Sequence, residues 1–130
     1  MEFALKAKSL MSHILLVEDN ADMQTLLCEL LQWGGHSVIT GRTGQEALDA
    51  LYSTQQLPEL IISDLNMPRL DGIGLLEAVR KNPNWKQVAF IIMSANINDE
   101  RLSSDIVRSL DGVIPKPFSL DDLNLILSRV

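Results

Sequence analysis

The sequence has little cysteine, few aromatic residues and no long hydrophobic run. Cys28 is the single cysteine among 130 residues, which excludes an internal disulfide framework and favours a reducing, cytoplasmic location. No apolar run approaches the ~18 residues that a membrane span needs, and no signal-peptide pattern is present. These absences argue against a secreted disulfide-rich protein and against a membrane protein.

Basic residues are scarce relative to acidic ones. The chain has 11 Lys and Arg residues against 17 Asp and Glu residues, a formal net charge of -6. Nucleic-acid binding needs a basic face, so we expect this segment not to bind nucleic acid. The length suits one domain with one core, and the 46% hydrophobic content is typical of a globular protein.

The first ten residues carry no turn signal or partner strand. Met11-Ser12 then resembles a second start. We therefore expect residues 1–10 to be a cloning leader or a disordered arm, and residues 11–130 to form the domain. A native N-terminal helix is the alternative.

From His13 onward, short apolar runs alternate with helical spacing. The apolar runs predict strands over 13–17, 37–40, 60–63, 88–93 and 113–114. Apolar periodicity and caps predict helices over 21–33, after the capping box at 43–46, over 72–81, over 99–110 and after Ser119. This alternation predicts a doubly wound, five-stranded parallel sheet with helices on both faces. Because Pro115 cannot donate to a ladder, the fifth strand is expected at an edge.

The histidines, the cysteine and the tryptophans are interpreted as structural residues. His13 and His36 are expected at strand boundaries, and Cys28 beside core leucines. Trp33 and Trp85 lie near element ends, where packing is their expected role.

Polar residues follow four of the five strands. They are Glu18-Asp19 after the first, Asp64 after the third, Ser94 after the fourth and Lys116 after the fifth. The carboxyl ends of parallel strands lie at one edge of a sheet, so these groups are expected to meet in one crevice. Three carboxylates repel one another, and a hard divalent cation relieves that repulsion. Oxygen ligands without histidine or cysteine indicate Mg²⁺, with Mn²⁺ as a substitute.

The same set suits phosphoryl transfer onto Asp64. Lys116 supplies a cation for a phosphate oxygen, and Ser94 and the backbone N–H of Ala95 supply hydrogen bonds. The site lacks a histidine base, which suits a reaction that depends mostly on positioning and charge neutralisation.

The motifs 15–20, 64–72, 94–95 and 116–118 resemble those of a response-regulator receiver domain of two-component signalling, of the chemotaxis-regulator type. The resemblance implies a flavodoxin-like strand order 2-1-3-4-5 with five helices. It implies that Asp64 accepts a phosphoryl group from a phosphohistidine of a sensor kinase or a histidine phosphotransfer protein. Such a domain is a phosphorylated signalling module and not a turnover enzyme, although it assists its own phosphorylation and dephosphorylation.

The resemblance also implies roles for individual residues. Mg²⁺ would be held by Asp19, Asp64 and the backbone carbonyl of Asn66, with Glu18 acting through water. Lys116 would pair with the phosphoryl group, Ser94 would swing to bond it, and Asn66 and Asn96 would flank the attacking water and tune hydrolysis. The Lys116-Pro117 peptide is expected to be cis.

Val113 departs from the family pattern, which often has an aromatic switch residue three positions before the lysine. Output is nevertheless expected through the face formed by the fourth helix, the fifth strand and the fifth helix. The kinase-side partner is expected to dock over the first helix, around Asn20, Ala21 and Gln24.

Two other functions stay open from the sequence. One is a Mg²⁺-dependent phosphatase of the haloacid-dehalogenase type, which would need a general acid where the chain has Asn66. The other is a receiver that docks partners without phosphorylation, which Val113 keeps open. The kinase, the output, homodimerisation on phosphorylation and membership of a larger regulator or hybrid kinase are not fixed by the sequence.

Overall fold

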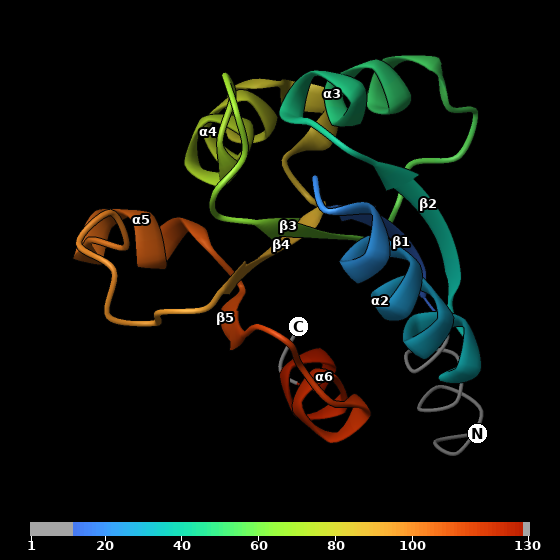
Figure 1. The fold of residues 1–130 in the computed structure, drawn as a ribbon. Coiled ribbons are helices and arrows are strands. Elements are labelled where there is room, and N and C mark those ends of the chain that lie inside the picture. Colours follow the sequence, from blue (N-terminus) through green and yellow to red (C-terminus); the bar gives the residue numbers. More distant parts are fainter. Residues whose placement is uncertain (1–11, 129–130) are drawn as a thin grey trace.

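The computed structural model describes residues 12–128 as an α/β fold (Figure 1). The expected leader at 1–10 lies outside the described residues. The strands are β1 (His13–Val17), β2 (Ser37–Gly41), β3 (Leu60–Asp64), β4 (Ala89–Ser94) and β5 (Gly112–Pro115). The helices are α2 (Ala21–Trp33), α3 (Gly44–Ser53), α4 (Gly72–Lys81), α5 (Ser104–Ser109) and α6 (Leu120–Leu127), with a 3₁₀ turn, η1 (Pro83–Trp85).

All strand pairings are parallel, and the strand order is β2-β1-β3-β4-β5. This order confirms the flavodoxin-like prediction and the edge position of β5. Val17 pairs with Ser63, Asp64 with Met93, and Ser94 with Pro115. The strand ends that carry polar residues are therefore in register at one edge of the sheet.

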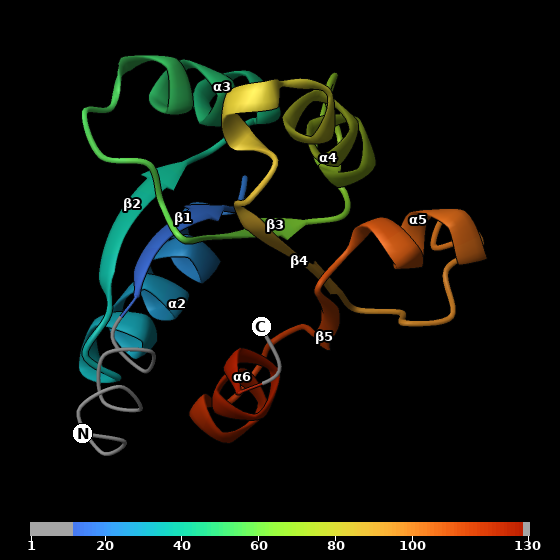
Figure 2. The same cartoon turned by 180° about the vertical axis from the view of Figure 1, so that it is seen from behind.

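Helices cover both faces of the sheet (Figures 1 and 2). Residues of α3, α4 and α5 pack on one face against Leu15, Ile61 and Phe90, and residues of α2 and α6 pack on the other against Leu16 and Ile62. Every residue of β3 and β4 is buried because both faces of these central strands are covered. The core thus fixes the strands whose ends carry Asp64 and Ser94.

Side-chain caps set the starts of the helices. Asn20, Asp71 and Ser119 each accept a backbone N–H of the following first turn. Ser119 and Asp122 complete a reciprocal capping box. The capping box expected at 43–46 is only half formed, because Thr43 accepts from the Glu46 N–H while the Glu46 carboxylate accepts from the Arg42 N–H.

The fourth helix is shorter than its apolar spacing predicted. We expected a helix over 99–110, but α5 begins at Ser104, and Ser103 is its N-cap. The Asp99 carboxylate accepts from the backbone N–H of Arg101 at 2.9 Å, which closes a local turn instead of starting a helix. The segment 96–103 is therefore a loop at the polar edge of the sheet.

The two tryptophans differ in environment. Trp85 is buried and its ring makes an edge-to-face contact with Tyr52, which agrees with the packing role expected for it. Trp33 is 85% exposed, so the packing role predicted for it is wrong. It lies two positions beyond the buried Leu31, which turns it to the opposite side of α2. Within residues 12–128, no helix is long and apolar enough to cross a membrane.

Candidate functional site

The ends of four strands bring the predicted polar groups together. Glu18 and Asp19 follow β1, Asp64 ends β3, Ser94 ends β4 and Lys116 follows β5. Backbone hydrogen bonds continue the ladder beyond the last strand pair, since the N–H of Lys116 donates to the carbonyl of Ser94 at 3.0 Å. The convergence expected from the strand order is therefore present.

Three carboxylates form a tight cluster. One oxygen each of Glu18, Asp19 and Asp64 lies within 4.8 Å of the others. Glu18 and Asp64 are buried, whereas Asp19 is exposed, so the cluster is open to solvent on the Asp19 side. A set of carboxylate oxygens with one open side fits a hard divalent cation such as Mg²⁺.

Lys116 lies between two of these carboxylates. Its Nζ is 2.6 Å from Oε1 of Glu18 and 2.9 Å from Oδ2 of Asp64. Burial by itself disfavours the charged ammonium, but the hydrogen bonds to Glu18 and Asp64 outweigh it, so the pKa of Lys116 is raised. The lysine therefore stays cationic at neutral pH and offsets part of the acidic charge.

Glu18 experiences opposing influences. Burial is the largest effect and raises the pKa of Glu18. The hydrogen bonds from Lys116 and from the Asn20 N–H lower this pKa, whereas the nearby acids Asp64 and Asp19 raise it further. The net direction is upward. The Asn20 N–H donates to Oε2 at 3.0 Å, which holds the carboxylate in place at the start of α2.

The Ser94 hydroxyl is engaged with the loop that follows β4. Its Oγ donates to the carbonyl of Asn96 at 2.7 Å and accepts from the N–H of Asn96 at 3.0 Å. Ser94 is buried, whereas Ala95 and Asn96 are exposed. The hydroxyl must leave these bonds before it can bond a new group at the carboxylate cluster.

Arg101 is a charged residue of the site that no sequence pattern predicted. Its Nη2 donates to Oδ1 of Asn66 at 2.5 Å and to Oδ2 of Asp99 at 2.8 Å. Arg101 and Asn66 line a hollow of about 290 Å³ together with Asp19, Met67, Pro68 and Asp71. Nothing in the apolar spacing reveals Arg101, because a helix was expected where the loop brings it to Asn66.

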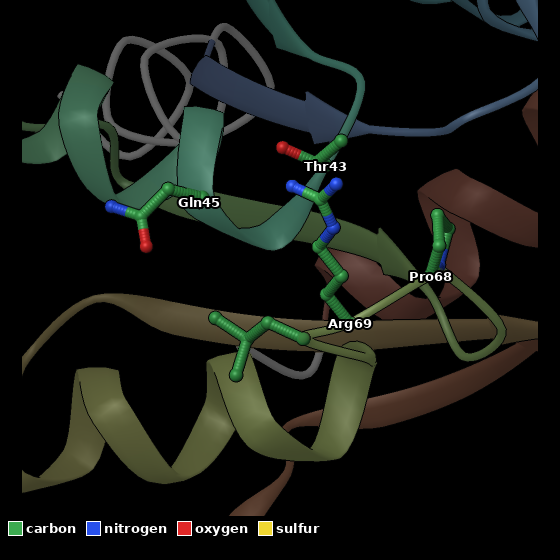
Figure 3. A pocket seen from close by; sticks show the side chains of 5 residues that line it. Thr43, Gln45, Pro68 and Arg69 are labelled. Atoms are coloured by element: carbon green, nitrogen blue, oxygen red, sulfur yellow. The ribbon is translucent and has the colours of Figure 1, made fainter.

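A second, larger hollow lies beside the 65–71 loop (Figure 3). It has a volume of about 490 Å³ and is lined by Thr43, Gln45, Pro68, Arg69 and Leu70. Arg69 adopts a left-handed backbone with φ of 68°, and in Figure 3 its guanidinium lies beside Thr43. The carboxylate cluster does not line this hollow, so the larger volume does not mark the site with the chemistry.

The structure also places the Lys116-Pro117 peptide, Val113 and the expected docking residues of α2. The Lys116-Pro117 peptide is cis, as expected. Val113 lies half-buried on β5. On α2, Ala21 is exposed, while the Gln24 amide donates to the carbonyls of Glu18 and Gly41 and so ties α2 to the ends of β1 and β2.

The chain is similar to known signalling proteins over almost its whole length. A family model described as the response regulator receiver domain matches residues 14–128. A probable chemotaxis protein CheY of Rhizobium etli is 34% identical over 118 residues, covering 90% of each chain. The structure of Vibrio cholerae chemotaxis protein CheY4 matches with a TM-score of 0.81 and 28% identity, covering 92% of this chain and 98% of that one.

Some relatives are longer than this chain. The transcriptional regulatory protein CpxR of Escherichia coli is 33% identical over 109 residues, which cover 84% of this chain but 44% of CpxR. The match to the DNA-binding transcriptional regulator NtrC of Klebsiella pneumoniae covers 24% of that protein. The chain thus spans less than half the length of these relatives.

These matches and the strand order show that the chain belongs to the response-regulator receiver family of two-component systems. Receiver domains are signalling domains and not classical enzymes, which argues against the phosphatase alternative. They bind Mg²⁺ at an acidic pocket, and they interact with histidine kinases and output domains.

Proposed function

We propose that this receiver accepts a phosphoryl group on Asp64 from a phosphohistidine of a sensor kinase or a histidine phosphotransfer protein. The observation that carries the proposal is the contact of Lys116 Nζ with Oδ2 of Asp64 at 2.9 Å, inside a cluster of three carboxylates. A carboxylate that lies beside one cation and within reach of a metal is suited to act as a nucleophile toward phosphorus.

In the transfer step, an oxygen of Asp64 forms a bond to phosphorus. The P–N bond to the donor histidine breaks, and its electron pair goes to the imidazole nitrogen, which takes up a proton. Lys116 then pairs with an oxygen of the phosphoryl group, and the backbone N–H of Ala95 donates to another. The chain assists its own phosphorylation in this way without turning over a substrate.

The residues that would hold Mg²⁺, or Mn²⁺ in its place, are Asp19, Asp64 and the backbone carbonyl of Asn66, with Glu18 acting through water. The carboxylate cluster within 4.8 Å supports this assignment. The bound cation would neutralise charge on the transferring phosphoryl group.

Phosphorylation would draw the Ser94 hydroxyl away from Asn96 and onto a phosphoryl oxygen. The loop 96–103 connects Ser94 to α5. This movement would therefore increase the population of the active conformation of the face formed by α5, β5 and α6. Val113 provides no aromatic ring for this change. Asn66 and Asn96 would flank the attacking water in the later hydrolysis.

The kinase-side partner would dock near the site, around the N-cap Asn20 and around Ala21 and Gln24 of α2, in a cytoplasmic location. Charge substitution at the exposed Ala21 should slow transfer from the partner. An unchanged transfer rate would contradict this docking surface. A homodimer of the phosphorylated form would use the output face.

The decisive experiment is intact mass measurement after incubation with acetyl phosphate, with and without Mg²⁺. We expect a single phosphate adduct that requires Mg²⁺, is absent from Asp64→Asn and is retained in Asp105→Asn. Asp105 is a suitable control because it is exposed on α5 and pairs with Arg108. If the folded wild-type protein forms no adduct with acetyl phosphate or with a phosphorylated kinase, docking without phosphorylation becomes the better interpretation.

A further inference from the structure

Arg101 contacts the candidate site but has no role in the proposed transfer of the phosphoryl group to Asp64. It lies in the loop between β4 and α5, which is 35 positions along the chain from Asn66. Its guanidinium nevertheless reaches the residue that lies two positions after Asp64. The side chain of Arg101 is 41% exposed and lines the hollow beside the carboxylate cluster.

The orientation of this guanidinium is fixed by Asp99. Nε donates to Oδ1 of Asp99 at 3.0 Å and Nη2 donates to Oδ2 at 2.8 Å, a bidentate pair. The backbone N–H of Arg101 also donates to Oδ1 of Asp99 at 2.9 Å. A guanidinium held along its Nε/Nη2 edge by one carboxylate presents the remaining Nη2 hydrogen in a defined direction.

The contact with Asn66 also fixes that side chain. Arginine can only donate, so the atom of Asn66 that faces Nη2 at 2.5 Å must be the amide oxygen. Oδ1 is the only side-chain acceptor of Asn66. Arg101 therefore engages the atom by which Asn66 would accept a hydrogen bond from a water molecule.

Hydrolysis of an aspartyl phosphate needs such a water. The water oxygen forms a bond to phosphorus while the O–P bond to Asp64 breaks, with its electron pair returning to the carboxylate. Both water protons stay on the phosphate, which leaves as H₂PO₄⁻. A neighbouring acceptor orients this water, whereas an N–H that donates to its lone pair weakens it as a nucleophile.

We propose that Arg101 is a positioning residue that prolongs the phosphorylated state by holding the Asn66 amide oxygen. This inference rests on the proposed function, since it concerns the lifetime of the phosphoryl group on Asp64. It assigns to the 96–103 loop a direct influence on how long the signal lasts.

Arg101→Ala tests the proposal. It frees Oδ1 of Asn66, so the first-order rate constant of dephosphorylation should rise about three- to tenfold, the equivalent of one hydrogen bond. The protein would be loaded with acetyl phosphate and Mg²⁺, freed of donor by rapid desalting, and followed by intact mass. Arg108→Ala is the matched control, because Arg108 is an exposed arginine that pairs only with Asp105 within the described residues.

A double-mutant cycle with Asn66→Ala separates positioning from a general loosening of the loop. If Arg101 acts through Asn66, Arg101→Ala should accelerate hydrolysis in the wild-type background and have little effect beside Asn66→Ala. An equal acceleration in both backgrounds, or a rate in Arg101→Ala that is unchanged or slower, would overturn the inference.

The loading step keeps the two proposals apart. Failure of the wild-type protein to load with acetyl phosphate or a phosphorylated kinase contradicts the proposed function itself. Normal loading followed by an unaltered lifetime in Arg101→Ala contradicts only the role of Arg101.

Discussion

Gly72 lies so close to Asp64 that a side chain at position 72 would collide with the backbone of Asp64. A Cβ built on Gly72 would be 2.5 Å from the carbonyl oxygen of Asp64 and 3.1 Å from the Cα of Leu65. The N–H of Gly72 donates to the carbonyl of Leu65 at 3.0 Å, which closes the 65–71 loop. The absence of a side chain at the start of α4 thus allows the loop to fold back onto the strand end.

Gly72→Ala is therefore expected to destabilise the protein by about 1–3 kcal/mol, the usual cost of forcing atoms into a filled space. Urea unfolding measures the change. Gly74→Ala is the matched control, because the nearest atom to its Cβ would be the flexible end of Leu70 at 2.6 Å and no backbone atom is among its near contacts, and alanine is the better helix former. Equal losses in both variants would refute the close-approach argument.

Mg²⁺ should stabilise the folded protein. A ligand that binds only the native state raises the Tm by an amount that grows with the logarithm of its free concentration relative to Kd, and the cluster of Glu18, Asp19 and Asp64 would supply the oxygens. Asp19→Asn should abolish this rise. In metal-free protein it should also increase stability by about 0.5–1 kcal/mol, because it removes one of three repelling charges at an exposed position.

Thermal unfolding in EDTA and in excess Mg²⁺ measures both effects. Asp22→Asn, which changes an exposed acid in the first turn of α2, is the control. It should keep the full response to Mg²⁺. A Tm that rises equally in Asp19→Asn and the wild type would contradict the metal assignment.

His36 should make stability depend on pH. Its Nδ1 accepts from the N–H of Ser12 at 3.1 Å, and its buried Nε2 has no partner among residues 12–128. Burial lowers the pKa of His36 from its ordinary 6.5, against a smaller opposing effect of Glu59. The unfolded chain therefore binds the proton more readily than the folded one, so stability is full above pH 6.5 and is lost as the pH falls toward and through the lower folded pKa.

His36→Asn keeps an acceptor for the Ser12 N–H but removes the titration. Urea unfolding at pH 7.5 and 5.5 should show a smaller loss of stability in this variant than in the wild-type protein. Identical losses would mean that other groups set the acid sensitivity.

Arg80 joins α4 to the residue before β4, to the end of α5 and to the segment between α5 and β5. Its guanidinium donates to the carbonyls of Val88 at 2.7 Å and Ser109 at 3.0 Å, and it pairs with Asp111 at 3.3 Å. Arg80→Met, which keeps the apolar stem, should cost about 1–3 kcal/mol because the carbonyl of the buried Val88 loses its donor. Amide exchange in α5 should accelerate with it.

Lys81→Met provides the comparison, since Lys81 is the exposed neighbour of Arg80 at the end of α4. It should leave both urea unfolding and amide exchange in α5 nearly unchanged. Equal effects of the two substitutions would show that the hydrogen bonds of Arg80 do not hold α5 in place.

The sequence alone determined the order of elements and the identity of the polar strand ends. The apolar runs before Glu18, Asp64 and Ser94 are continuous because β1, β3 and β4 are buried on both faces, and such runs are visible without coordinates. Since parallel strands end at one edge, the meeting of these residues with Lys116 followed from that pattern.

The tertiary structure decided what depends on contacts between distant loops. The apolar spacing over 99–110 predicted a helix. The side chain of Asp99 instead accepts a hydrogen bond from the backbone N–H of Arg101, and α5 begins only at Ser104. That local competition places Arg101 against Asn66, a contact that no periodicity encodes. Periodicity reports which side of an element is buried, whereas the partner of a loop side chain is set by where the fold brings a second loop.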